Sequence, residues 1–340
     1  MQTDLAYYLQ PFFETYLARQ RGLSPNTLKS YRDTFKLLIA YLQRRYPKAR
    51  SLRITQLDAK TVLDFLEYLE DADVGRGNSA QTRNARRAAI RCFFEYVAMH
   101  HPALERQADR ILMIPKKRAN KKPADALDRQ ELEAMLAQPN TDTPDGIRDL
   151  ALLAFLYNVG ARATEAAQIS LSGFDFPNRL VTIRGKGDKE RLTPLWPSTV
   201  KLLEVYAKDY RRKPKTGFSD CFFINQRGRS FTRFGIRNVV KKYVRLAAKK
   251  CPSLATKKLA AHSMRHTCAS HLLEARVESR AISGWLGHAL MSSTDTYLHT
   301  NLNFKRQILE KFGPPDYVAS VLKPKGGDSP DKLLDWLKNL

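Results

Sequence analysis

The chain has 340 residues, of which 43% are hydrophobic, so it is long enough for two domains with their own cores. It carries 58 lysines and arginines against 34 acidic residues, a formal net charge of +24 at pH 7. Such a surplus indicates an anionic partner, with nucleic acid first and an anionic membrane surface second. A soluble basic protein with solvated charges is the alternative that charge alone leaves open.

The basic excess is not confined to one tail. Residues 1–122 hold 23 basic and 12 acidic side chains, net +11, and residues 123–340 hold 35 and 22, net +13. Two basic domains suit a clamp around a polyanion better than a globular core with a basic tail.

The four cysteines are scattered without a CxxC pair, which argues against a disulfide framework or a zinc site and fits a reduced, cytoplasmic setting. No apolar stretch approaches the roughly 20 residues of a membrane span. The first residues lack a basic segment followed by an apolar one, so we expect no signal peptide and no membrane partner.

Residues 1–105 are predicted to form a helical domain. Ser24 is a plausible N-cap with Pro25 in the first turn, and the apolar residues that follow have helical spacing. The expected helices cover residues 5–19, from 25 to beyond 40, 58–69 and 79–99.

Basic side chains of this domain and of the segment after it are candidates for DNA contact. Three arginines spaced four apart share one face of the fourth helix, with no acidic neighbour apparent on it. An ordinary solvated face is the alternative. The candidate DNA-contacting residues are Lys29, Arg32, Lys36, Arg83, Arg87, Arg91, Arg118, Lys121 and Lys122.

Residues 106–125 are interpreted as a basic linker, because prolines interrupt them and lysines and arginines cluster at their end. Residues 126–322 are predicted to form a second domain, mainly helical, with a small antiparallel sheet. Its β-hairpin pairs residues 180–183 with 191–194 around Gly-Lys-Gly-Asp-Lys. The tail, residues 323–340, is predicted to contain a short amphipathic helix. The expected helices of the second domain cover residues 147–159, 198–210, 231–249, 264–275, 278–286 and 293–311.

Four stretches of the second domain carry polar residues that helix packing does not require. Arg162 follows an apolar helix and a glycine, and alone it would be read as a surface residue. Lys186 lies at the hairpin tip, where a solvated turn lysine is the commoner case. His262 and Arg265 stand three apart at a helix start, so both can face one cleft. Tyr297 is one of 14 tyrosines, most of which are expected in the core or at the surface.

A metal site is the competing interpretation of His262 and His266, which stand four apart. The carboxylate of an HExxH motif is missing and no third ligand is evident, so we expect no metal and no cofactor.

Together these residues suit attack on a phosphodiester. Two arginines can bind the non-bridging oxygens, and a histidine can donate a further hydrogen bond. A tyrosine phenol, with a pKa of about 10, needs a base and a cationic setting to attack at neutral pH. A mobile lysine can protonate the leaving 5′ oxygen.

The order and spacing of these residues resemble those of the tyrosine recombinases, which include the phage integrases and the Xer recombinases. The resemblance covers nearly the whole chain, and residues 261–300 look most similar to the Xer-like branch. It implies a SAM-like helical core-binding domain followed by a mixed α+β catalytic domain. The residues that carry it are Arg162, Glu165, Lys186, His262, Arg265, His288 and Tyr297.

The resemblance also implies a role for each of these residues. Tyr297 would form a 3′-phosphotyrosine link to DNA, and Lys186 would be the general acid. His262 would be the general base or a phosphate contact, and Glu165 would brace the site. The residues that would hold the scissile phosphate are Arg162, Arg265 and His288.

The family usually has an aliphatic residue before its first arginine and Ile-Ser after it. This chain has Ala161, Ala163 and Thr164, which weakens its placement in a subfamily.

The implied activity is site-specific recombination of double-stranded DNA through a Holliday junction. It would be carried out in the cytoplasm, at the nucleoid, by a homotetramer on two sites, with an accessory recombinase as a potential partner. The tail helix would dock on a neighbouring protomer, or else pack on its own domain. The alternatives are a type IB topoisomerase, a catalytically idle DNA-binding regulator, and an RNA- or membrane-binding protein, which would leave the set of polar residues unexplained.

Overall fold

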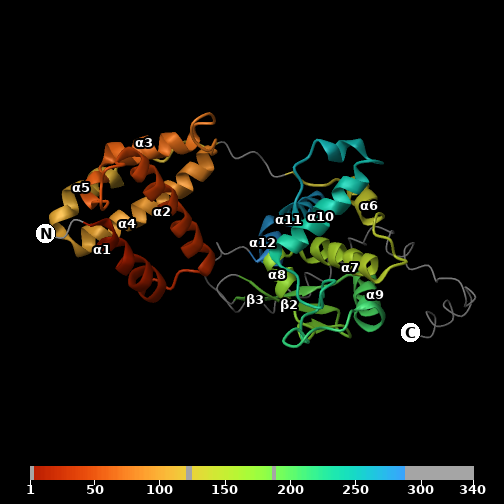
Figure 1. Ribbon diagram of the computed structural model, residues 1–340. Helices are drawn as coiled ribbons and strands as arrows, with labels where there is room; N and C mark the ends of the chain where they lie inside the picture. The colour runs from red at the N-terminus through yellow and green to blue at the C-terminus, as the bar shows by residue number, and fades with distance from the viewer. Residues whose placement is uncertain (1–3, 120–124, 186–188, 288–340) are drawn as a thin grey trace, which may run out of the picture. The chain divides into compact units, whose positions relative to one another are not determined.

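The computed structural model describes residues 4–119, 125–185 and 189–287. The chain divides into two compact units, Met1–Lys122 and Pro123–Leu340, each with its own buried cluster of hydrophobic side chains (Figure 1). Within the described ranges, no helix combines the length and the apolar character needed to cross a membrane.

The described part of the first unit is built from helices. Helix α4 lies at its centre and packs against α2, α3 and α5. Its apolar side, which includes Phe93 and Phe94, is fully buried. The helices are α1 (Leu5–Pro11), the π-helix η1 (Phe12–Gln20), α2 (Pro25–Arg45), η2 (Ile54–Gln56), α3 (Ala59–Glu70), α4 (Ala80–His100), η3 (Pro102–Leu104) and α5 (Glu105–Leu112).

The sequence predicted these helix starts because their caps are local. The Ser24 hydroxyl accepts a hydrogen bond from the Thr27 backbone N–H at 3.3 Å, with Pro25 in the first turn. The first predicted helix has the expected extent, but its geometry changes to π directly after Pro11. A proline lacks the N–H that continues the α-helical ladder, so a change of hydrogen-bond register at this point has a physical cause.

The linker interpretation is wrong for residues 106–112, because Glu105–Leu112 forms helix α5. Its residues Ala108 and Ile111 are buried in the first core. The helix places its apolar residues on one side against α4, and its charged residues outward.

The expectation of a row of arginines without acidic neighbours on α4 is also wrong. Arg91 pairs with Glu95 at 2.9 Å, and Arg83 lies 3.7 Å from Glu70. The guanidinium groups hold the last residue of α5 and the segment that follows it, because each donates to a backbone carbonyl there. The hydrogen bonds are Arg83 to the Pro115 carbonyl at 3.1 Å, Arg87 to the Ile114 carbonyl at 2.6 Å and Arg91 to the Leu112 carbonyl at 2.9 Å.

The second unit is organised around helix α7, whose residues from Gly146 to Val159 are all buried (Figure 1). Helices α11 and α9 pack on it, as does η4. The elements are α6 (Arg129–Leu136), α7 (Pro144–Val159), α8 (Ala163–Gln168), β1 (Phe174–Asp175), β2 (Leu180–Arg184), β3 (Glu190–Pro194), α9 (Pro197–Val205), the π-helix η4 (Tyr206–Tyr210), α10 (Arg233–Ala247), η5 (Pro252–Ala255), α11 (Ala261–Glu274) and α12 (Ser279–Leu286).

The three described strands form one antiparallel sheet in the order β1-β2-β3. The register of the predicted hairpin pairs Leu180 with Pro194 and Ile183 with Arg191. Helices with a small antiparallel sheet in the second unit, and helices alone in the described part of the first, confirm the predicted fold class.

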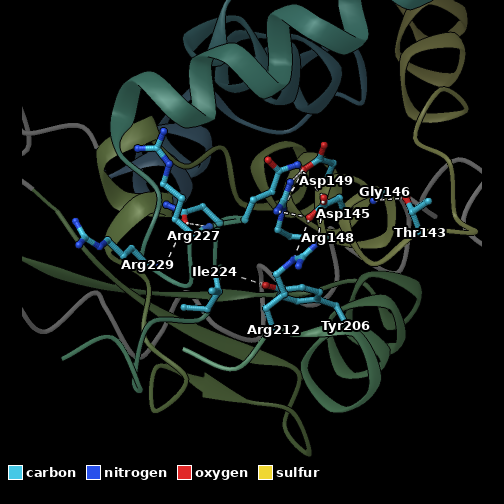
Figure 2. A network of polar contacts seen from close by, with 12 residues as sticks. Thr143, Asp145, Gly146, Arg148, Asp149, Tyr206, Arg212, Ile224, Arg227 and Arg229 are labelled. Carbon is cyan, nitrogen blue, oxygen red and sulfur yellow. Dashed lines mark hydrogen bonds and ion pairs between the residues drawn. The ribbon is translucent and has the colours of Figure 1, made fainter. Parts of the chain in front are cut away.

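A buried polar network anchors the N-terminal end of α7 (Figure 2). Arg148 is paired with Asp149 at 2.6 Å and with Asp145 at 2.8 Å, and the Asp145 carboxylate also binds Arg212 at 3.3 Å. The Tyr243 hydroxyl, on α10, donates to Asp149 at 2.8 Å. The network therefore joins α7 to α10 and to the loop after η4. It lies at the opposite end of α7 from Gly160, about 16–22 Å along the helix.

Replacing Tyr243 by phenylalanine removes one donor from the buried Asp149 carboxylate. We expect the free energy of unfolding to fall by about 1–3 kcal/mol, because a charged acceptor loses a hydrogen bond that water cannot replace. Urea denaturation of the full chain measures the change. A change of less than about 0.5 kcal/mol is expected for Glu190→Ala, which breaks an exposed ion pair with Arg184. Equal losses of unfolding free energy in the two variants would show that the hydrogen bond from Tyr243 to Asp149 does not stabilise the fold.

Candidate active site

Arg162 lies at the start of helix α8, three residues before Glu165. The Glu165 carboxylate accepts hydrogen bonds from the Arg162 backbone N–H at 2.9 Å and from its Nη1 at 2.6 Å. This arrangement caps the helix and holds the arginine side chain at the same time. Glu165 is buried, whereas the side chain of Arg162 is 35% exposed. The Arg162 side chain is therefore held by Glu165 and still remains accessible to solvent.

Arg265, on α11, is buried between the ends of two other helices. Its Nη1 donates to the Gly160 carbonyl at 2.9 Å, just after α7, and its Nη2 donates to the Leu286 carbonyl at 2.6 Å, at the end of α12. The C-terminal ends of helices carry partial negative charge, which favours a cation there. A guanidinium has five N–H groups, so donors remain for a further acceptor.

Burial, and then the charges of Arg162 and Arg191, lower the pKa of Arg265 to about 10. The guanidinium is therefore still charged at neutral pH. Burial alone would raise the pKa of Glu165, but Arg191 and Arg162 outweigh it, so the pKa of this carboxyl is lowered. Arg162 and Arg191 pair with the Glu165 carboxylate, and Arg265 is close enough to feel all three charges, so the local charge is +2 and suits an anion.

Arg191 was missed as a site residue by the sequence analysis, which treated it only as part of a strand. Its Nη2 donates to Glu165 at 2.7 Å, and both side chains are buried. A signal was present in the sequence, because alternation along β3 places Arg191 on the same side as Thr193, facing inward. An arginine at an inward position of a strand requires a buried acceptor.

His262 lies in the first turn of α11, which begins at Ala261 and not near residue 264 as predicted. The earlier start places His262 and Arg265 on one helix. The His262 side chain is exposed, and its ring contacts the ring of His266 with 4.6 Å between their centroids. Burial and the nearby Arg265 charge lower the pKa of His266, which favours its neutral form. Within the described ranges, no three His, Cys, Asp or Glu side chains are grouped as a metal would require.

Lys186, His288 and Tyr297 lie outside the described residues, but the residues that directly precede two of them are described. A Cβ added to Gly185 would lie 3.6 Å from Glu165 Oε1, and one added to Gly287 would lie 3.0 Å from Arg191 Cδ. Gly185 and Gly287, which directly precede Lys186 and His288 in the sequence, therefore both lie against the Glu165–Arg191 pair.

The candidate DNA contacts of the first unit fall into three groups. Lys29, Arg32 and Lys36 are exposed on α2, and Arg118 is exposed beyond α5. Arg32 also forms an exposed ion pair with Asp33 at 3.1 Å. The arginines of α4 are engaged by the protein as described above. Two further candidates, Lys121 and Lys122, lie outside the described residues.

Comparison with known proteins agrees with this architecture. The phage integrase family profile matches residues 125–303, and the profile of the phage integrase N-terminal SAM-like domain matches residues 11–100. The putative integrase/recombinase y4rC of Sinorhizobium fredii is 35% identical over 99% of this chain and 98% of its own length. Tyrosine recombinase XerD of Staphylococcus haemolyticus is 30% identical over 92% of this chain and 99% of its own.

Solved structures share the fold. The XerH recombinase bound to difH DNA before cleavage is 23% identical, with a TM-score of 0.59 over 82% of this chain and 78% of that chain. The Tn1549 transposon integrase in complex with circular intermediate DNA is 16% identical, with a TM-score of 0.62 over 95% of this chain and all of that chain.

A SAM-like helical domain joined to an α+β domain with a cluster of arginines defines the class of tyrosine recombinases, enzymes that cleave and rejoin DNA strands. The chain belongs to the phage integrase family, which confirms the resemblance seen in its sequence.

Proposed function

We propose that this chain is a site-specific DNA recombinase in which Tyr297 is the nucleophile. The observation that carries the proposal is the site around Glu165, where Arg162 and Arg265 are held in place before any substrate binds. Donors that need no rearrangement stabilise the charge that develops on phosphorus oxygens more effectively than solvent does. The proposed phosphate-binding residues are Arg162, Arg265 and His288.

In the proposed reaction the Tyr297 phenol oxygen attacks phosphorus and loses its proton to His262 or to water. The bond to the 5′ oxygen breaks, and Lys186 gives that oxygen a proton. The 3′ phosphate remains joined to the tyrosine, so the energy of the broken bond is kept for rejoining. A 5′ hydroxyl from the partner strand then reverses the steps and releases the enzyme. Two such exchanges create and resolve a Holliday junction.

We further propose that DNA phosphates bind to exposed basic side chains of the first unit, namely Lys29, Arg32, Lys36 and Arg118, together with Lys121 and Lys122. These contacts set the position of the enzyme and do not read sequence. Arg87 and Arg91 also remain proposed contacts, because each is partly exposed and a hydrogen bond to one backbone carbonyl leaves it further N–H groups, whereas Arg83 is buried.

The proposed assembly is a homotetramer on two DNA sites in the cytoplasm, at the nucleoid. The helix that the sequence predicts within residues 331–340, which lie outside the described residues, would dock on a neighbouring protomer, and an accessory recombinase would be a further partner. Integration or excision, resolution and transposition are the candidate roles. Transposition is consistent with the similarity to the Tn1549 transposon integrase, which was solved on transposon-derived DNA.

The test uses a suicide duplex, nicked so that the released fragment diffuses away, with DNA flanking the gene as the candidate site. Wild-type protein is expected to form a covalent adduct on denaturing gels, and Tyr297→Phe to form none, because phenylalanine has no nucleophilic oxygen. Tyr210→Phe is the matched control and should form the adduct.

An adduct with Tyr297→Phe would place the nucleophile elsewhere. No adduct with wild type, despite specific binding, would favour a DNA-binding regulator. Relaxation of a supercoiled plasmid without a second site would favour a type IB topoisomerase.

A further inference from the structure

Arg191 is tied to the candidate site by more than one contact. Its ion pair with Glu165 has an Nη2–Oε2 distance of 2.7 Å, and the two side chains are only 7% and 3% exposed. Its Nε is buried without a hydrogen-bond partner among the residues that the structure describes. A buried arginine with an unpaired N–H lowers the stability of the fold. A role in the active site would explain why an arginine stands at this position.

The position of Arg191 in the fold indicates such a role, because it lies between the β2–β3 hairpin and helix α8. It lies on β3, directly after the strand pairing of Arg184 with Glu190 that closes the hairpin. Its guanidinium lies 3.8 Å from a Cβ placed on Gly185, at the base of the same hairpin. Its partner Glu165 lies on α8 and holds Arg162. The Glu165–Arg191 pair is therefore a direct link between the hairpin and the helix that presents Arg162.

We propose that Arg191 is a positioning residue that holds the β2–β3 hairpin against α8, so that Lys186 is kept beside the phosphate bound by Arg162. This inference rests on the proposed function, because it assumes that Lys186 is the general acid. Arg191 is only 7% exposed and is bound to Glu165, so the proposal assigns it no direct contact with the substrate. Its effect is geometric, since a displacement of about 1 Å can cost about 100-fold in rate.

A substrate that needs no general acid separates this role from a merely structural one. In ordinary DNA the leaving 5′ oxygen must gain a proton as its bond to phosphorus breaks. If sulfur replaces that bridging oxygen, the group leaves as a thiolate, which is stable near neutral pH because thiol pKa values are about 8.5. Misplacement of Lys186 should then slow cleavage of the oxygen duplex only.

The experiment measures single-turnover adduct formation by the full chain on matched suicide duplexes with bridging oxygen or sulfur. For Arg191→Met we expect a rate about 10–100-fold below wild type on oxygen, and within about threefold of wild type on sulfur. Lys186→Ala is the reference and should show the same pattern. A wild-type rate on oxygen, or equal slowing on both duplexes, would overturn the proposal.

Two further variants guard against loss of folding. Arg191→Lys keeps the charge but not the planar fork, so we expect an intermediate rate on oxygen. Arg184→Met breaks the exposed ion pair with Glu190 in the same hairpin. It should leave the ratio of the two rates unchanged. Thermal unfolding of each variant fixes a reaction temperature at which all of them are folded.

Failure of the proposed function has a different signature. If wild type forms no adduct, or Tyr297→Phe forms one, the assignment of the nucleophile falls whatever Arg191 does. A second outcome is that the adduct depends on Tyr297 but Lys186→Ala slows cleavage of both duplexes equally. Lys186 is then not the general acid, and the role proposed for Arg191 is wrong as well.

Discussion

Replacing Arg265 by lysine is expected to slow strand cleavage by about 10²–10³-fold, comparable with the loss of a preorganised transition-state donor. Arg265 spans two carbonyls, those of Gly160 and Leu286, and has N–H groups left for a phosphate oxygen. A lysine ammonium is a single point of charge with three N–H groups and cannot reproduce this fork. Single-turnover adduct formation on the suicide duplex measures the loss.

The matched control for this variant is Arg129→Lys, an exposed arginine in the same unit. Its rate should stay within about twofold of wild type, as for most surface substitutions. Circular dichroism should show both variants folded. Cleavage by Arg265→Lys at more than a tenth of the wild-type rate would contradict the assigned role of Arg265.

Replacing Gly160 by alanine is expected to destabilise the protein by about 3 kcal/mol and to suppress cleavage as well. Gly160 has a φ of +59°, and an added Cβ would lie 2.3 Å from the Leu286 side chain. The left-handed conformation costs about 1–2 kcal/mol for a residue with a side chain, and overpacking adds about 1–3 kcal/mol. The buried Leu286 side chain must repack to relieve the overlap, and the backbone carbonyl of the same residue holds Arg265, so we expect the arginine to be displaced as well.

Gly217→Ala separates the two causes, because Gly217 has a φ of +85° but no atom within 4 Å of an added Cβ. Only the conformational cost remains there, and cleavage should be unaffected. Chemical denaturation and adduct formation test both variants. Equal losses of stability in the two would show that overlap with Leu286 does not matter.

The sequence predicted best where the determinants are local. The capping serine before α2 and the glycine-rich turn between β2 and β3 were identified because each signal lies within a few residues of its effect. The end of α7 was predicted for the same reason, since Gly160 adopts the left-handed conformation that ends helices.

Features that depend on distant partners were missed or misread. The hydrogen bonds of the α4 arginines to backbone carbonyls were missed, because those carbonyls belong to residues 112–115, more than 20 positions along the chain. Arg191 was overlooked because its partner Glu165 lies 26 residues away. Of the catalytic residues expected from the family resemblance, the structure brings together Arg162, Glu165 and Arg265, and it places His262 three residues before Arg265 on α11.

The hydrogen bonds that hold Arg265 also have a consequence for folding, because they set when the protein becomes able to cleave DNA. The contact between Arg265 and Gly160 joins residues 105 positions apart, and it exists only when α7, α11 and α12 have docked. Such long-range contacts are completed late in folding, because closing a long loop is entropically costly. A nascent or half-folded chain already carries the basic residues that attract DNA, yet its phosphate-binding fork is unassembled. We therefore expect the ability to cleave DNA to arise after the ability to bind it.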